Sequence, residues 1–80
     1  MYSKVTLVIA DMNDESDIFI ERDVGNVLRE NGIRDRMLIS NDGVPKQLEV
    51  VLAREASPEQ ADNASIQLRS TFQIDEIEWK

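Results

Sequence analysis

Residues 37–53 read MLISNDGVPKQLEVVLA, and this stretch decides the fold. An apolar run at 37–39 and a largely apolar segment at 47–53 lie on either side of Asn41, Asp42 and Gly43. These residue types favour a tight turn, because Asp and Gly tolerate positive φ angles. Two apolar runs around such a turn predict a β-hairpin.

The segment before the hairpin predicts a strand and a helix. Residues 4–10 are β-branched and apolar, as in a buried strand. Four apolar residues then follow helical spacing: Ile20, Val24, Val27 and Leu28. Gly32 favours the end of this helix. Because Gly25 weakens a helix, a second interpretation stays open, with residues 18–20 as a short strand and a helix only from about Asp23.

The segment after the hairpin predicts a second helix and a last strand. Ser57 and Gln60 form the pattern of a capping box, and Pro58 between them suits a first helical turn. The apolar face that follows consists of Ala61, Ala64, Leu68 and Phe72. Ile66 falls on the opposite face. Residues 74–80 alternate apolar and charged residues, as in a half-buried strand.

The element order is β-α-β-β-α-β, which is that of the α+β, ferredoxin-like fold. We therefore expect residues 1–80 to form a single domain, with a four-stranded antiparallel sheet in the order 4-1-3-2 and two helices on one face. The two most apolar strands would lie at its centre. The predicted core consists of Leu7, Ile9, Val24, Leu28, Val50, Leu52, Leu68 and Phe72.

The composition excludes several kinds of chemistry. The 80 residues include no histidine and no cysteine, so the usual general base, a thiol nucleophile and the commonest zinc ligands are missing. We expect no catalytic residue and no cofactor. The chain has no apolar run near the roughly 18 residues of a membrane span and no signal peptide, which predicts a cytoplasmic protein. Its net charge of −7 should repel nucleic acid and anionic membranes.

Residues 10–19, ADMNDESDIF, hold a cluster of acids. The spacing of Asp11, Asn13 and Glu15 imitates the start of a calcium loop. However, Ser16 and Arg22 stand where that loop needs glycine and a bidentate glutamate. Acidic residues before a helix also interact favourably with the positive end of its dipole, and they cap its free N–H groups. We therefore predict no metal ligand here.

A magnesium site at Asp11 is the alternative, because Mg²⁺ needs only one or two carboxylates besides water and phosphate. In its βαββαβ order and its acid after the first strand, the chain resembles the small CRISPR adaptation nucleases. That resemblance implies a Mg-dependent nuclease or phosphohydrolase using Asp11. It covers topology more than motif, and the chain lacks the basic surface that such an enzyme needs.

Topology predicts that acids gather at one end of the sheet. In a ferredoxin-like fold, the end of the first strand, the hairpin turn and the start of the last strand lie together. That end would hold an acidic pole made of Asp11, Asp14, Glu15, Asp17, Asp42, Asp75 and Glu76. Arginines would lie toward the opposite end. Such a pole suits a basic protein partner, although a merely solvated pole explains it as well.

The alternation of residues along the strands predicts a second candidate surface, on the sheet face away from the helices. Alternation along the strands places Tyr2, Val8 and Val51 on it, together with Thr6, Ala53 and Leu38. An apolar patch with a charged rim is typical of an interface. We therefore predict a non-enzymatic protein-interaction or regulatory module, either an inhibitor of a basic nucleic-acid-handling protein or a homodimer that associates through the sheet face or an edge strand.

Overall fold

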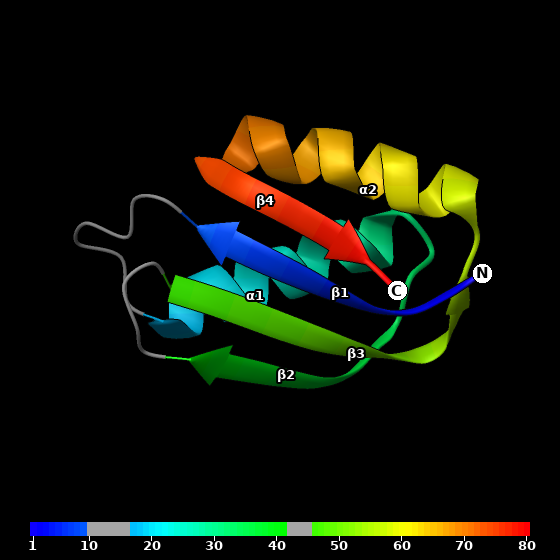
Figure 1. The fold of residues 1–80 in the computed structure, drawn as a ribbon, viewed down its shortest axis with the longest axis horizontal. Helices are drawn as coiled ribbons and strands as arrows, with labels where there is room; N and C mark the ends of the chain where they lie inside the picture. Colours follow the sequence, from blue (N-terminus) through cyan, green and yellow to red (C-terminus); the bar gives the residue numbers. More distant parts are fainter. Residues whose placement is uncertain (10–16, 42–45) are drawn as a thin grey trace.

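The structure is a computed structural model that describes residues 1–9, 17–41 and 46–80 (Figure 1). Its elements are β1 (Tyr2–Ile9), α1 (Asp17–Glu30), β2 (Asp35–Asn41), β3 (Lys46–Ala56), α2 (Pro58–Thr71) and β4 (Ile74–Trp79). The four strands form one antiparallel sheet in the order β2-β3-β1-β4. The predicted α+β, ferredoxin-like fold is confirmed. The alternative strand at residues 18–20 is wrong, because these residues belong to α1.

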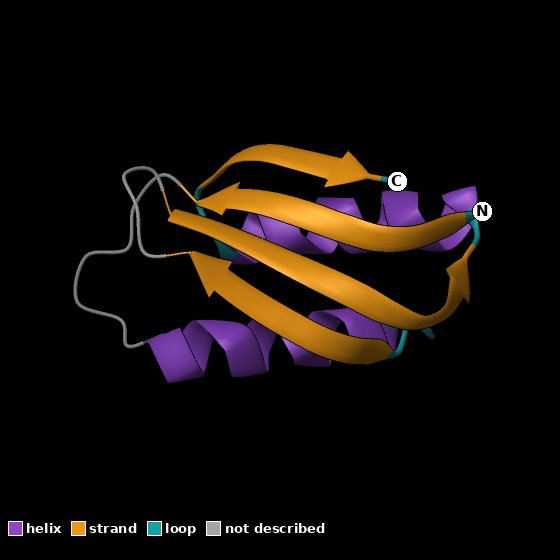
Figure 2. Ribbon diagram, turned by 60° about the horizontal axis from the view of Figure 1, so that its bottom comes forward, coloured by secondary structure: helices purple, strands orange, loops and turns teal. Residues whose placement is uncertain are grey.

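The two helices pack on one face of the sheet and leave the other face open (Figure 2). On β1, Val5, Leu7 and Ile9 point to the helices and are almost fully buried. On β3, alternate residues from Leu48 to Leu52 do the same. The sheet order confirms the predicted central position of these two strands, which each have a neighbouring strand on both sides.

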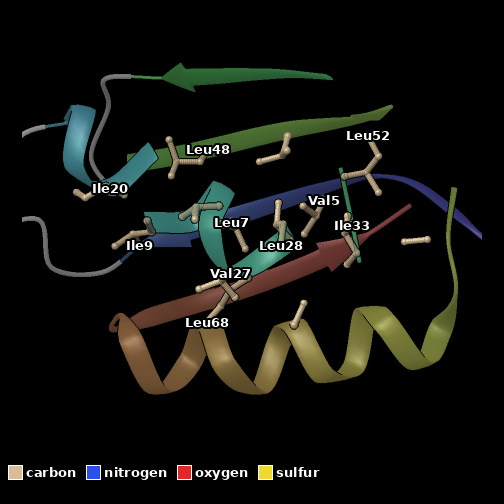
Figure 3. Close-up of a cluster of buried hydrophobic side chains, with 14 residues drawn as sticks. Val5, Leu7, Ile9, Ile20, Val27, Leu28, Ile33, Leu48, Leu52 and Leu68 are labelled. Carbon is tan, nitrogen blue, oxygen red and sulfur yellow. The ribbon is translucent and has the colours of Figure 1, made fainter. Parts of the chain in front are cut away.

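The core between sheet and helices is aliphatic (Figure 3). It contains Val5, Leu7, Ile9, Ile20, Val24, Val27, Leu28, Ile33, Leu48, Val50, Leu52, Ala56, Ala64 and Leu68. Seven of the eight predicted core residues are among them. The exception is Phe72, which is half-buried because it lies at the C-terminal cap of α2, where it packs against the margin of the core.

The end of α1 and the start of α2 are as the sequence predicts. Gly32 adopts a φ of 75°, and its amide donates to Arg29, while the Ile33 amide donates to Leu28. These two bonds form a Schellman motif that satisfies the last carbonyls of α1. At the start of α2, Ser57 Oγ accepts from the Gln60 amide at 3.1 Å, and Gln60 Oε1 accepts from the Ser57 amide at 3.0 Å.

The Gln60 side chain joins these two helix ends. Its Nε2 donates to the carbonyl of Asn31 at 3.2 Å, and the carbonyl of Gly32 lies 3.4 Å away. The same amide therefore closes the capping box of α2 and binds the free carbonyls behind α1. This contact fixes the end of one helix against the beginning of the other.

Ser40 on β2 has a buried hydroxyl that finds no hydrogen-bond partner among the described residues. An unsatisfied buried polar group costs about 1–3 kcal/mol. We therefore expect Ser40→Ala to raise the free energy of unfolding by about 1 kcal/mol in urea denaturation. Ser65→Ala is the matched control, because the Ser65 hydroxyl accepts from Trp79 Nε1 at 2.9 Å. The control should lose stability; a loss in Ser40→Ala too would contradict the assignment.

Candidate functional site

Three chain segments meet at one end of the sheet, as the topology predicts. Ile9 pairs with Lys46 on one side and with Ile74 on the other, and β2 ends beside the start of β3 (Figure 1). Asp75 and Glu76 lie at this end and are exposed. The other predicted members of the acidic pole lie outside the description: Asp11, Asp14, Glu15 and Asp42, and the side chain of Asp17. The full pole therefore stays a prediction.

Acidic residues also lie along β4, the outer strand that pairs with β1. Asp75, Glu76 and Glu78 are all exposed, and we call these three residues the acidic edge. Glu76 lies opposite Val8, and Glu78 lies opposite Thr6, so both glutamates belong to the open sheet face. Lys80 Nζ approaches Glu78 at 3.5 Å. Only part of the negative charge of the edge is offset by this pair.

Val8 was predicted to belong to the exposed patch of the open face. It does point away from the helices, since its neighbours Leu7 and Ile9 belong to the core. Yet only 8% of it is exposed. It lies on a central strand, opposite Gln47 on β3 and Glu76 on β4. Val8 therefore contributes almost no area to a partner, which corrects the prediction.

Tyr2 was also predicted on the open face, and that placement is wrong. The amides of Ser3 and Lys4 both donate to the carbonyl of Lys80, a pattern typical of a β-bulge. The extra residue reverses the alternation before Lys4. Tyr2 consequently pairs with Ala56, a core residue, and its ring lies 6.0 Å from that of Trp79, which packs against the core.

The open face instead carries an apolar strip that the sequence reasoning missed. Met37 and Ile39 on β2 are 52% and 42% exposed, and Met37 pairs with the half-buried Val51. Leu38 was predicted on this face, but it packs against the core. Because residues 37–39 are all apolar, the sequence does not show which of them points to the core and which to the open face. The pairing of Leu38 with buried Val50 decides it.

The middle of the open face is polar. Lys4 Nζ lies 3.4 Å from Glu49 Oε1, and both side chains are more than a third exposed. A pair exposed to this extent contributes at most about 1 kcal/mol. It separates the apolar strip on β2 from the acidic edge on β4. The open face is thus apolar along one outer strand and acidic along the other.

No group of three or more potential metal-ligating side chains occurs within residues 1–9, 17–41 and 46–80. The candidate magnesium ligand Asp11 lies outside these residues. The described part of the chain also contains no helix long and apolar enough to span a membrane.

A magnesium titration tests the two interpretations of the acids at residues 11–17. If they only start α1 and face solvent, millimolar Mg²⁺ should leave the melting temperature unchanged. Specific binding at 100 times Kd would add about 2.7 kcal/mol and raise it visibly. Asp11→Asn is the matched variant. A saturable Mg²⁺ shift that Asp11→Asn abolishes would contradict our expectation and favour the nuclease interpretation.

No model of a known protein family matches the chain, and a search of curated proteins finds no match.

Proposed function

We propose that this protein is a small, acidic, non-enzymatic interaction module that docks on a basic protein. The observation that carries the proposal is the acidic edge, which places Asp75, Glu76 and Glu78 together on one exposed strand. A net charge of −7 on 80 residues adds a long-range field of the same sign. Such a field accelerates the encounter with a positively charged partner and disfavours acidic ones.

The geometry of a strand suits this role. Glu76 and Glu78 point to the same face, and residues two apart on a strand are separated by roughly 7 Å. Lysine or arginine side chains that project from one face of a strand or helix in the partner repeat at a similar distance. A strand of the sheet fixes the backbone from which the carboxylates project, so this backbone need not be ordered on binding.

One form of this function is inhibition of a basic nucleic-acid-handling protein. Carboxylates on the acidic edge would then occupy the lysines and arginines that otherwise bind phosphate. The proposal places the protein in the cytoplasm and gives it no direct contact with nucleic acid or anionic membranes, because both would repel it.

Affinity purification with charge variants tests this function. The variant Glu76→Gln/Glu78→Gln removes two charges from the acidic edge. The control Glu55→Gln/Asp62→Asn removes two exposed charges from the end of β3 and from α2. We expect wild type and control to retain one basic protein from a lysate, identified by mass spectrometry, and the edge variant to lose it.

Kinetics with that purified protein give the sharper result. The edge variant should associate at least about tenfold more slowly at low salt and dissociate at a similar rate, as is usual for charges at the rim of an interface. Wild type should also prevent the partner from binding DNA or RNA. Equal retention of the partner by wild type and edge variant would overturn the proposal.

A further inference from the structure

The two outer strands of the sheet differ in how they are protected. β4 carries three acids within six residues. β2 begins with Asp35 and Arg36, but residues 37–41 hold no charge. Charged side chains on an outer strand discourage pairing with other strands. By this criterion β4 is closed to strand addition and β2 is open to it.

The outer side of β2 is also available in the described part of the molecule. The sheet order β2-β3-β1-β4 leaves β2 with one neighbour, β3 (Figure 2). Alternate residues of an outer strand direct N–H and C=O groups away from the sheet. Met37 and Ile39 stand beside these groups and are about half exposed. β2 thus combines outward-facing backbone groups with apolar side chains that are exposed to solvent in the monomer.

We propose that β2 pairs antiparallel with β2 of a second copy, so that two sheets join into one of eight strands. β2 spans seven residues, and full overlap with its own copy centres the pair on Leu38. In that register, Met37 of one copy lies opposite Ile39 of the other. Because Met37 and Ile39 both belong to the open face, the open faces of the two copies then form one continuous face of the joined sheet.

Charge favours a second copy over face-to-face packing. Pairing through β2 places the two acidic edges at the far sides of the joined sheet, where they do not meet. Packing of two open faces would instead bring together the carboxylates of Glu49, Glu76 and Glu78 from both copies. At the ends of the paired strands, Asp35 of one copy meets the uncharged Asn41 of the other.

The apolar strip gives the joined sheet its side-chain contacts. Met37 of one copy and Ile39 of the other would be in contact across the junction, and the two-fold axis repeats this pair. A one-strand contact buries less than the about 800 Å² per partner of a standard interface. We therefore expect micromolar rather than nanomolar association. The inference extends the proposed interaction module but needs no basic partner, so each can fail without the other.

The absence of cysteine from the chain permits a precise test of the register. Directly opposed residues in an antiparallel pair have Cα atoms about 4.5–5.5 Å apart, within the range of a disulfide. Two single-cysteine proteins, Met37→Cys and Ile39→Cys, should form a covalent dimer when mixed at about 100 μM and oxidised. Each alone should not, since diagonal residues lie about 7–8 Å apart.

Three further measurements complete the test. Wild type should sediment as a concentration-dependent dimer, and Ile66→Cys, on the outer face of α2, should not cross-link with either variant. Val51→Glu should leave the dimer intact, because Val51 lies one strand inward from the pairing edge. A wild type that stays monomeric up to about 500 μM, cross-linking in another pattern, or a dimer that Val51→Glu abolishes would overturn the inference.

Discussion

Leu28→Ala should lower the free energy of unfolding by about 2–5 kcal/mol, the range for truncation of a buried leucine. Leu28 is 0% exposed, and its carbonyl also accepts the Ile33 amide that ends α1. The whole domain is stabilised by roughly 5–15 kcal/mol, and a chain of 80 residues lies toward the lower end. Truncation at this position therefore removes a large share of the stability.

Thermal and urea denaturation measure this effect. Each kcal/mol shifts the melting temperature of a domain this size by about 4–8 °C. The midpoint of Leu28→Ala should thus fall by at least about 8 °C. Ile66→Ala is the control, since Ile66 is equally apolar but 68% exposed on α2, and it should change stability by less than about 0.5 kcal/mol. Equal shifts in both variants would contradict the assigned core.

Gly32→Ala is expected to cost about 2 kcal/mol. The φ of 75° at Gly32 lies in the left-handed region, which costs an L-residue roughly 1–2 kcal/mol. An added Cβ would also lie 2.9 Å from Gln60 Nε2, so the Gln60 side chain must move. Since that side chain caps α2 and binds the end of α1, the substitution weakens both helix ends.

A double-mutant cycle separates strain from the loss of the Gln60 contacts. Gln60→Ala alone removes the capping-box amide and its bond to Asn31. In Gly32→Ala/Gln60→Ala, the Cβ no longer meets the glutamine, so the double variant should be more stable than the two single losses predict when added. The coupling should be at least about 0.5 kcal/mol. Strict additivity would show that Gln60 moves aside without cost.

The fold was predicted well where a short sequence pattern is compatible with only one local structure. The Ser57–Gln60 capping box and Gly32 each determine a helix end, and both appear where the sequence puts them. The alternation of β3 determined which residues face the core. The order of elements then determined the sheet, because a hairpin between two strand–helix units leaves few ways to pair four strands.

The open face was predicted less well, for reasons visible in particular residues. A bulge at Ser3 and Lys4 reversed the side on which Tyr2 lies, and no sequence signal marks it. The run Met37 to Ile39 is apolar on both faces, so alternation could not separate the core residue from the exposed ones. The low exposure of Val8 goes with its place on a central strand between β3 and β4, which local sequence does not reveal.

The pairing of β1 with β4 also bears on how the chain avoids aggregation while it folds. Contacts between elements so distant in sequence close slowly. Until β4 docks, β1 is itself an unprotected border of the sheet. Its segment 5–9, VTLVI, is β-branched, apolar and uncharged, the composition of segments that stack into cross-β fibrils. The acids of β4 then serve as gatekeepers, because the strand that finally covers this segment cannot itself recruit another.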